Sequence, residues 1–298
     1  MKLVGALSNP RARGFSVFLL ACVPLGAQVF TFSRDQMLRY TAQNPFDRFE
    51  DGRPKVPDSL LEKVKGLSAE EIFSVLPGKR YPNQFEGNWL ILHPERKLVG
   101  RAVTAQFMPV RPDVADVAEA DAKAKGLGRN PNQRVIDMLQ PGDVLVVDLF
   151  GKIEHGTMVG DNLATAIYAA TKTGLVVDGG IRDLEGVFPI EMSIYTRGVH
   201  PTAIGNVMLT GVNVPIRIGN ATVMPGDVVF GDREGLYFIP PQFVKEIVDK
   251  AEETHIHDEW TKQKFLTGKY KSSDIYPSPQ DPQLKQEYEE YKKKRLGR

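Results

Sequence analysis

Cysteine is almost absent from this chain of 298 residues, with Cys22 as its one example. A lone cysteine excludes an intramolecular disulfide and any metal site built on cysteine ligands. The glycine-rich motifs G-x-G-x-x-G and G-x-x-x-x-G-K are also missing, so dinucleotide binding and P-loop phosphate binding have no support. No serine lies in a G-x-S-x-G motif, and hydrolysis through a serine nucleophile is therefore unsupported as well.

The sequence also lacks an excess of charge of one sign. Its 38 Lys and Arg residues balance 37 Asp and Glu residues, which gives a formal net charge of +1. No dense stripe of Lys and Arg alternates with aromatic residues, so the electrostatic footprint of a dedicated nucleic-acid binder is missing. We therefore expect no nucleic-acid partner.

Near the N-terminus, the apolar run over residues 15–25 is too short to span a bilayer comfortably. It follows the basic residues Lys2, Arg11 and Arg13 and precedes small residues that end at Ala27. This three-part pattern predicts an export signal over residues 1–27, and hence a periplasmic or secreted protein. A short buried helix or strand is the alternative.

The run LLAC, which ends at Cys22, resembles a bacterial lipoprotein cleavage site. In that case Cys22 would carry a lipid, and a membrane would be a partner of the protein. The run LGA, which ends at Ala27, offers an ordinary cleavage site instead.

The body of the chain begins after a polar segment, residues 28–64, which we expect to be an irregular N-terminal extension packed on the body. Ser68 and Glu71 then form a capping box that opens an amphipathic helix, and Pro77-Gly78 ends it. Residues 98–110 have the β-branched content of a strand, and residues 132–143 predict a short helix with a Pro-Gly turn.

The next part of the chain predicts a strand, a helix and a strand in succession. Residues 144–149 are a short apolar run of the buried-strand type, and a loop over residues 155–160 follows. Residues 161–173 are Ala-rich and helical, and residues 175–180 form a second buried strand. A helix between two strands predicts a crossover with parallel pairing. A third strand is expected over residues 194–198.

The C-terminal third changes character. Residues 213–240 alternate short β-rich runs with Gly-Asn, Pro-Gly and Arg-Glu-Gly turns, which predicts hairpins. A charged helix is expected from Pro241 to Leu266, followed from Thr267 by a tail that is either peripheral or partly disordered. We therefore divide the chain into a body over residues 65–250 and a helical, charged C-terminal extension over residues 251–298.

The histidines offer little support for a metal site. His255 and His257 are two residues apart on a helix, so their rings point to different faces, and we expect both to be solvated surface residues. His155 lies five residues before Gly160 in the same predicted loop. It is either a hydrogen-bonded loop histidine or a neighbour of a site at Gly160.

The remaining candidate is a group of acidic and basic residues around the predicted crossover. Asp161 lies where a loop meets a helix, and it is either an N-cap or part of a site in which Gly160 and the amides of residues 161–163 favour an anion. Arg182 and Asp183 follow the second strand, and they are either a turn or the other half of that site. A crossover brings both loops to one sheet edge, where Arg182 would bind a carboxylate and Asp183 would offer oxygen ligands to Mg²⁺ or Mn²⁺.

At these residues the sequence resembles the RraA-like family. This family contains the class II 4-hydroxy-4-methyl-2-oxoglutarate / 4-carboxy-4-hydroxy-2-oxoadipate aldolases and the regulator of ribonuclease E activity A. The resemblance rests on an acidic residue after glycine, Asp161, then twenty residues, then Arg182-Asp183. Flanking runs agree with it, among them PGDVLVVD at residues 141–148, VVDGGIRD at 176–183 and VMPGDVVFGDREGLYFIP at 223–240.

The resemblance implies an α/β fold, a swivelling β/β/α domain over residues 65–250, carrying N- and C-terminal extensions. It also implies a homotrimer, or a hexamer of stacked trimers, with active sites at subunit interfaces. In such a site Asp183 would hold a divalent metal, usually Mg²⁺, largely through waters, and Arg182 would bind the carboxylate of a small 2-oxo acid. The backbone of Gly160, Asn162 and Leu163 would bind substrate oxygens, and Asp161 would orient the water that moves protons.

The function implied is a metal-dependent lyase that releases pyruvate from a 4-hydroxy-2-oxo acid and decarboxylates oxaloacetate. One alternative is a non-catalytic trimeric regulator, although that branch of the family tends to lose the aldolase aspartate and both aspartates are present here. Another is a related metal enzyme acting on a sugar-derived hydroxy acid. The export-like leader and both extensions depart from the shorter, cytoplasmic aldolases of the family.

Overall fold

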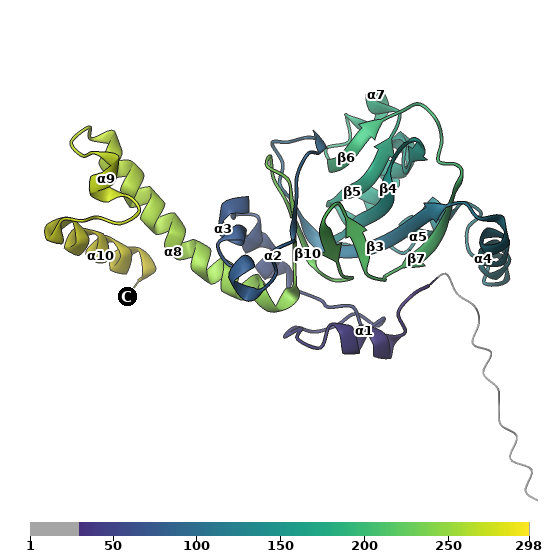
Figure 1. Ribbon diagram of the computed structural model, residues 1–298, viewed down its shortest axis with the longest axis horizontal. Helices are drawn as coiled ribbons and strands as arrows, with labels where there is room; N and C mark the ends of the chain where they lie inside the picture. Colours follow the sequence, from purple (N-terminus) through teal and green to yellow (C-terminus); the bar gives the residue numbers. More distant parts are fainter. Residues whose placement is uncertain (1–29, 298) are drawn as a thin grey trace, which may run out of the picture.

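The computed structural model describes residues 30–297 (Figure 1). The predicted export signal and Cys22 lie outside the described residues. Among residues 30–297, no helix combines the length and the apolar character that a membrane crossing requires. The fold is a mixed α/β arrangement in which helices pack on a curled sheet, and a helical arm extends from it (Figure 1).

Four parallel strands form the centre of the sheet, and they confirm the predicted crossover. The helix α6 connects the two strands that the sequence predicted over residues 144–149 and 175–180, and these strands pair in parallel. The strand predicted over residues 194–198 pairs in parallel with the second of them. The elements are β3 (Leu98–Pro109), β4 (Asp143–Thr157), α6 (Asp161–Thr171), β5 (Gly174–Ile181) and β6 (Ser193–Val199).

Antiparallel strands complete the sheet on both sides. Within the described residues it has nine strands, in the order β1-β11-β10-β3-β4-β5-β6-β2, and β7 pairs with β3 off this path. The hairpins predicted over residues 213–240 are confirmed as β8–β9 and β10–β11. The antiparallel strands of this sheet are β1 (Phe85–Glu86), β2 (Leu90–Leu92), β7 (Val207–Val212), β10 (Val228–Gly231) and β11 (Leu236–Ile239). The strands β8 (Ile216–Ile218) and β9 (Ala221–Val223) form a separate two-stranded sheet.

Alternation along the central strands directs side chains to two cores. Leu145, Val147 and Val177 face the core that α5 and α6 cover, whereas Val146 and Val176 face the β8–β9 hairpin. A third core lies where the helices near both chain ends meet β10 and β11. Burial on both faces explains why these strands read as continuous apolar runs.

Strand β4 is longer than the predicted residues 144–149, and part of the predicted loop over residues 155–160 belongs to it. Its pairing with β5 is interrupted by two shifts of register, between Asp148 and Lys152 and between Lys152 and Thr157. Phe150 and His155 have positive φ, which lets the strand bulge and then resume. The polar residues and glycines of this part of β4 lack the apolar pattern of a strand, so the sequence analysis did not predict it.

The N-terminal extension contains helices where we expected irregular structure. The capping box at Ser68 and Glu71, near the start of the body, is confirmed, with both reciprocal hydrogen bonds present. A buried ion pair holds the extension to the sheet, because Arg53 contacts Asp143 at 2.7 Å and both side chains are nearly inaccessible to water. The helices of the extension are α1 (Arg34–Tyr40) and α2 (Asp58–Val64), and the body begins with α3 (Ala69–Phe73) and the 3₁₀ turn η1 (Pro77–Lys79).

The predicted C-terminal helix is confirmed as α8 (Pro241–Leu266), and the tail after it is helical, which leaves the peripheral alternative. Two further helices, α9 (Ser272–Ile275) and α10 (Pro282–Leu296), fold back along the outer part of α8 (Figure 1). The buried ring of Trp260 contacts that of Tyr288 at 5.3 Å between centroids. The proposed boundary at residues 250 and 251 falls inside α8.

The same packing corrects the expectation for one of the two helical histidines. The two rings do lie on different faces, and the exposed His255 contacts the buried carboxylate of Glu71 at 2.6 Å. His257 is not a solvated surface residue, because its ring packs against Tyr276 and Tyr288 and is only 19% exposed. The helices of the tail cover it.

Two helices on the side of β7 complete the architecture. The first, α4 (Pro112–Ala124), was not predicted, and the second, α5 (Pro131–Ile136), forms the first half of the helix expected over residues 132–143. Each has proline at its first position, where the missing amide hydrogen costs nothing. A short helix, α7 (Leu184–Val187), follows β5.

Candidate active site

Backbone hydrogen bonds join the two loops that the crossover brings to one edge of the sheet. The Arg182 amide donates to the carbonyl oxygen of Val159 at 3.0 Å, and the Met158 amide donates to that of Gly180 at 2.9 Å. The residues after β4 and those after β5 therefore lie side by side. This confirms that the structure brings Gly160 and Asp183 together, as the topology predicted.

The side chain of Asp183 lies directly against Gly160. A Cβ atom built on Gly160 would be 2.2 Å from Asp183 Oδ2 and 3.3 Å from Arg182 Nε, so no larger residue fits without moving the aspartate. Asp183 itself has a φ of 58°, in the left-handed region. Residues other than glycine seldom adopt this conformation, and those that do are found more often at functional sites. This backbone conformation allows the close approach of the two loops.

Asp161 occupies the first turn of α6 and is not its N-cap. The N-cap is Gly160, which makes no side-chain cap. The Asp161 carboxylate accepts from the amide of Asn162 at 2.8 Å. A Cβ atom built on Gly186 would be 2.7 Å from Asp161 Oδ2, so this carboxylate lies against α7. The carboxylates of Asp161 and Asp183 are thus held where the N-termini of α6 and α7 meet.

Arg182 lies between the carboxylate of Asp183 and an open cavity. Its Nε atom lies 3.5 Å from Asp183 Oδ2, and both side chains are about two-fifths exposed (40% and 43%). An exposed pair of this kind contributes little to stability. Because the guanidinium is partly exposed, its solvent-facing hydrogen-bond donors are available to a ligand. The pair is therefore not a buried structural ion pair.

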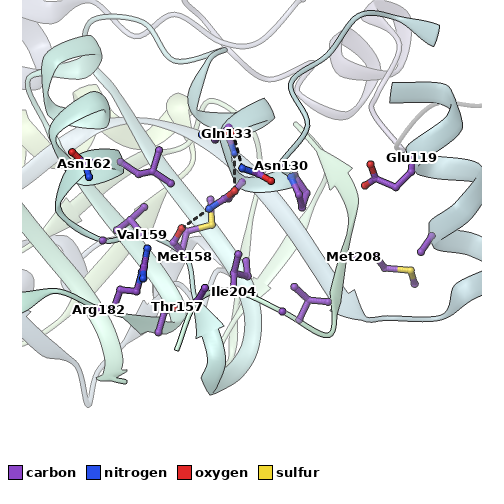
Figure 2. A pocket seen from close by; sticks show the side chains of 18 residues that line it. Glu119, Asn130, Gln133, Thr157, Met158, Val159, Asn162, Arg182, Ile204 and Met208 are labelled. Carbon is purple, nitrogen blue, oxygen red and sulfur yellow. Dashed lines mark hydrogen bonds between the residues drawn. The ribbon is translucent and has the colours of Figure 1, made fainter. Parts of the chain in front are cut away.

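A cavity of about 600 Å³ adjoins this group, with Arg182 and Asn162 on one side of it (Figure 2). Gly160 and Leu163 also line it, as do residues of β4, α4, α5 and β7. Asp161 and Asp183 are direct neighbours of lining residues, but they do not themselves line the cavity. Four of the six residues that the sequence singled out thus line one corner of a larger pocket, and the two aspartates lie beside that corner.

The far side of the pocket comes from residues that the sequence analysis missed. Glu119 of α4 and Met208 of β7 lie across the cavity from Arg182 (Figure 2). No sequence motif connects these two residues with the residues around Gly160. Pro112, with an acidic residue after it and an Ala-rich run beyond, was the signal that could have revealed α4.

His155 does not belong to the pocket. Its amide donates to the hydroxyl of Thr202 at 2.7 Å, and its exposed side chain is not among the groups that line the cavity. His155 is therefore a hydrogen-bonded residue of the bulged end of β4, as the first of its two interpretations predicted.

The donor set at this corner restricts the metals that it could hold. Among residues 30–297, no group of three or more His, Cys, Asp or Glu side chains is arranged to bind a metal ion. Zinc sites need three or four protein ligands, whereas Mg²⁺ keeps several waters and uses one or two carboxylates. A single carboxylate at Asp183, with Asp161 nearby, fits Mg²⁺ or Mn²⁺ held largely through water.

A second acidic pair lies deeper in the sheet. Asp148 and Asp178 are partners in the register of β4 and β5, and Arg197 contacts Asp178 at 2.7 Å. Burial raises the pKa of Asp148, and the neighbouring charge of Asp178 raises it further. The Arg197 guanidinium also pairs with Glu86 and stacks on the Trp89 ring at 3.7 Å. This cluster ties β1 and β2 to the central strands.

Comparison with known proteins gives the same fold. A structure of RraAS2 from Streptomyces coelicolor, described as an unusual member of the RNase ES inhibitor RraA protein family, superposes with a TM-score of 0.62 at 27% identity. The match covers 70% of this chain and all of that one (100%). A protein from Pseudomonas syringae shows the same fold, with a TM-score of 0.59 at 24% identity over 76% of this chain and 94% of that one. The predicted α/β fold of the RraA-like type is confirmed.

Sequence relatives agree with this result. Protein DlpA of Legionella pneumophila is 26% identical over 214 residues, which is 70% of this chain and 32% of DlpA. A protein of Halalkalibacterium halodurans, named for a proposed 4-hydroxy-4-methyl-2-oxoglutarate aldolase activity, is 32% identical over 119 residues, 40% of this chain and 56% of that protein. This chain thus spans about a third and about half of the lengths of these two relatives. The family model described as RraA-like, Aldolase/RraA, matches residues 79–237, more than half of the chain, which therefore belongs to the RraA-like family.

Proposed function

We propose that this protein is a divalent-metal-dependent lyase that cleaves a 4-hydroxy-2-oxo acid to pyruvate and also decarboxylates oxaloacetate. The observation that carries the proposal is the contact of Asp183 with Gly160, beside Arg182 and a cavity of about 600 Å³. Membership of a family that includes aldolases supports it.

The two reactions share one intermediate. In the retro-aldol reaction the C3–C4 bond breaks, the 4-hydroxyl loses its proton to become a carbonyl, and the electron pair passes to C3. In oxaloacetate the C3–C4 bond also breaks, but carbon dioxide leaves. Both give the enolate of pyruvate, which takes a proton at C3. A catalyst for either reaction must stabilise negative charge on the oxygen at C2.

Arg182 is the group that would bind the substrate's carboxylate. Its planar guanidinium can form two parallel hydrogen bonds with a carboxylate, and its Nε atom is oriented by Asp183 at 3.5 Å. The amides of Asp161 and Leu163 belong to the first turn of the 11-residue helix α6, where the helix dipole favours a negative oxygen, while that of Asn162 donates to the Asp161 carboxylate. The 2-oxo acid would thus lie with its carboxylate at Arg182 and its oxygens at the start of α6.

The two aspartates would have separate tasks. Asp183 would hold Mg²⁺ or Mn²⁺ mainly through waters, and the metal, when bound, supplies positive charge beside the developing enolate. Asp161, fixed against Gly186, would orient the water that delivers and removes protons.

Assembly and location are part of the same proposal. We infer a homotrimer, or a hexamer of two trimers, with the pocket completed by a neighbouring subunit. We also infer export through residues 1–27, with a lipid on Cys22 if the lipoprotein site is used. Size-exclusion chromatography with light scattering and mass spectrometry of the mature protein test these two points.

Purified protein with Mg²⁺ and oxaloacetate tests the activity. We expect pyruvate to form, EDTA to abolish its formation, and Asp183→Ala to lower the rate by orders of magnitude. Glu185→Ala is the matched control, since Glu185 lies in the first turn of α7 but does not line the cavity. A folded protein that turns over no 2-oxo acid and binds no metal would contradict the proposal.

That negative result would favour the second candidate function, a non-catalytic regulator built on the same scaffold. The observation in its favour is the 27% identity and TM-score of 0.62 to a member of the RNase ES inhibitor family. Its test is binding of this protein to a partner protein, with Asp183→Ala leaving the affinity unchanged.

A further inference from the structure

A second cavity, of about 160 Å³, lies where the N-terminal extension meets the body. Among the described residues, it shares no lining residue with the pocket at Arg182. Its wall comes from the end of α1, the segment before β1, the β9 hairpin and the start of α8. The lining groups that could recognise a ligand are Tyr40, Tyr81, Gln84, Thr222, Asp227 and Gln242.

Asp227 brings a buried carboxyl group to this wall without a cation beside it. The residue is 3% exposed, and its Oδ2 atom accepts from the amide of Met224 at 2.8 Å. No other group of residues 30–297 forms a hydrogen bond or an ion pair with this carboxyl group. Burial raises its pKa to about 7. A positive charge in the cavity would therefore stabilise the ionised form of Asp227.

Gln84 adds a second hydrogen-bond acceptor to the wall. This residue is 8% exposed, and its Nε2 atom donates to the carbonyl oxygens of Phe238 at 2.7 Å and Thr222 at 3.3 Å. The two carbonyl groups fix the orientation of the side-chain amide, because its oxygen could accept nothing from them. The Oε1 atom therefore has no donor among the described residues. A buried acceptor of this kind normally has a partner, which a ligand or a water can supply.

The donors close to the cavity are already engaged. Arg48 does not line it, and its guanidinium donates to the hydroxyl of Thr41 at 2.7 Å. The Nε2 atom of Gln242 donates to Gln43 Oε1 at 3.3 Å and to the hydroxyl of Tyr81 at 3.4 Å. A ligand that satisfies Asp227 and Gln84 must therefore bring its own donors.

Two tyrosine rings complete the chemistry of the cavity. The ring of Tyr81 packs on that of Phe243 at 5.0 Å between centroids, and the ring of Tyr40 stacks on that of Phe32 at 5.1 Å. Aromatic rings attract cations over their faces, and hydrocarbon chains also pack on them. A metal ion fits this cavity less well, because among residues 30–297 no three His, Cys, Asp or Glu side chains are arranged to bind one.

We propose that this cavity binds a small organic cation with a primary ammonium group. The ammonium group donates hydrogen bonds to Asp227 and Gln84, and the carbon chain lies against Tyr40 and Tyr81. The bound cation joins the extension to the body, because Tyr40 belongs to α1 and Asp227 follows β9. The site is separate from the proposed lyase site and does not depend on it.

Titration calorimetry of the whole protein with propylammonium chloride tests the proposal, at about pH 8 and constant ionic strength, so that Asp227 is mostly ionised. Propan-1-ol is the neutral control of the same size, and tetramethylammonium is a cation without a hydrogen-bond donor. We expect propylammonium to bind about tenfold or more tightly than either control. Equal affinities for propylammonium and one of the controls, or no binding of propylammonium, would overturn the proposal.

Three variants locate the bound cation. Asp227→Asn removes the charge but keeps an acceptor for the amide of Met224, and we expect it to weaken propylammonium binding about tenfold or more. Tyr40→Ala removes a ring that is 61% exposed, so the protein should fold normally, and we expect binding about threefold weaker. Asp183→Ala should leave the affinity unchanged, since Asp183 does not line this cavity. Unchanged affinity in folded Asp227→Asn or Tyr40→Ala, or weaker binding in Asp183→Ala, would overturn the proposal.

Discussion

The carboxylate of Asp183 lies so close to the Cα atom of Gly160 that a methyl group on that glycine would stand 2.2 Å from Asp183 Oδ2. The two residues are far apart in the sequence, and the crossover through α6 brings them together. The absence of a side chain at Gly160 is therefore a requirement of the site and not of the backbone, since Gly160 has an ordinary negative φ of −109°.

Gly160→Ala should displace Asp183 and lower activity far more than stability. We expect kcat/KM to fall at least tenfold, because a misplaced metal-binding group weakens catalysis strongly. Steady-state kinetics at several Mg²⁺ concentrations measure the effect. Gly78→Ala is the control, since a Cβ atom there meets nothing within 4 Å. A Gly160→Ala protein with unchanged kinetics would show that the contact does not matter to the reaction.

Arg182→Lys should weaken substrate binding although it keeps the charge. Lysine offers a point charge in place of two parallel hydrogen bonds, so we expect KM for a 2-oxo acid to rise about tenfold or more. Arg96→Lys is a suitable control, because Arg96 is an equally exposed arginine that pairs with Glu191. An equal KM for Arg182→Lys and the parent protein would contradict the role of Arg182.

The buried pair Arg53–Asp143 should hold the N-terminal extension to the sheet. Arg53→Met leaves the carboxylate of Asp143 buried without its cation, and we expect a loss of about 3–5 kcal/mol in the free energy of unfolding. Urea denaturation measures this loss. Arg53→Met combined with Asp143→Leu should recover part of it, because no uncompensated charge remains. If the double variant were no more stable than the single one, the ion pair would not be the cause.

Asp227 should make stability depend on pH. Full burial raises its pKa from 3.8 to about 7, so the folded state favours the neutral carboxyl. For a group whose pKa is raised on folding, the stabilisation is complete below the unfolded pKa and is lost as pH rises toward the folded value.

The free energy of unfolding should therefore decline through this group between about pH 4 and pH 7. Asp227→Asn, which keeps an oxygen for the amide of Met224, should flatten the decline. Thermal unfolding between about pH 4 and pH 7 measures the decline in the free energy of unfolding, and Asp249→Asn on the exposed face of α8 is the control. The same slope in Asp227→Asn and the parent protein would contradict the assignment.

Local patterns predicted the elements around the site well. The apolar runs on either side of α6, the Ala-rich helix and the capping box at Ser68 depend on neighbours in the sequence, and each was confirmed. The spacing between Asp161 and Arg182 then indicated which loops meet. The structure adds that they meet through the contact of Asp183 with Gly160.

What could not be predicted depends on contacts between distant segments. Arg53 and Asp143 are 90 residues apart, and nothing in either segment indicates the other. The helix α10 is mostly polar, and its Tyr288 packs against Trp260 of α8. The far wall of the pocket is a third example, since Glu119 reaches it from a helix whose sequence has no functional motif.

The central claim is that Gly160, Arg182 and Asp183 form a metal-dependent site that generates the enolate of pyruvate. Its most direct test is the exchange of pyruvate methyl protons for deuterium, followed by NMR in D₂O with the whole protein. We predict rapid exchange with Mg²⁺, none above background with EDTA or with Asp183→Ala, and an unchanged rate with Glu185→Ala. Exchange that persists in Asp183→Ala, or that never occurs in the folded, Mg²⁺-supplied parent protein, would contradict it.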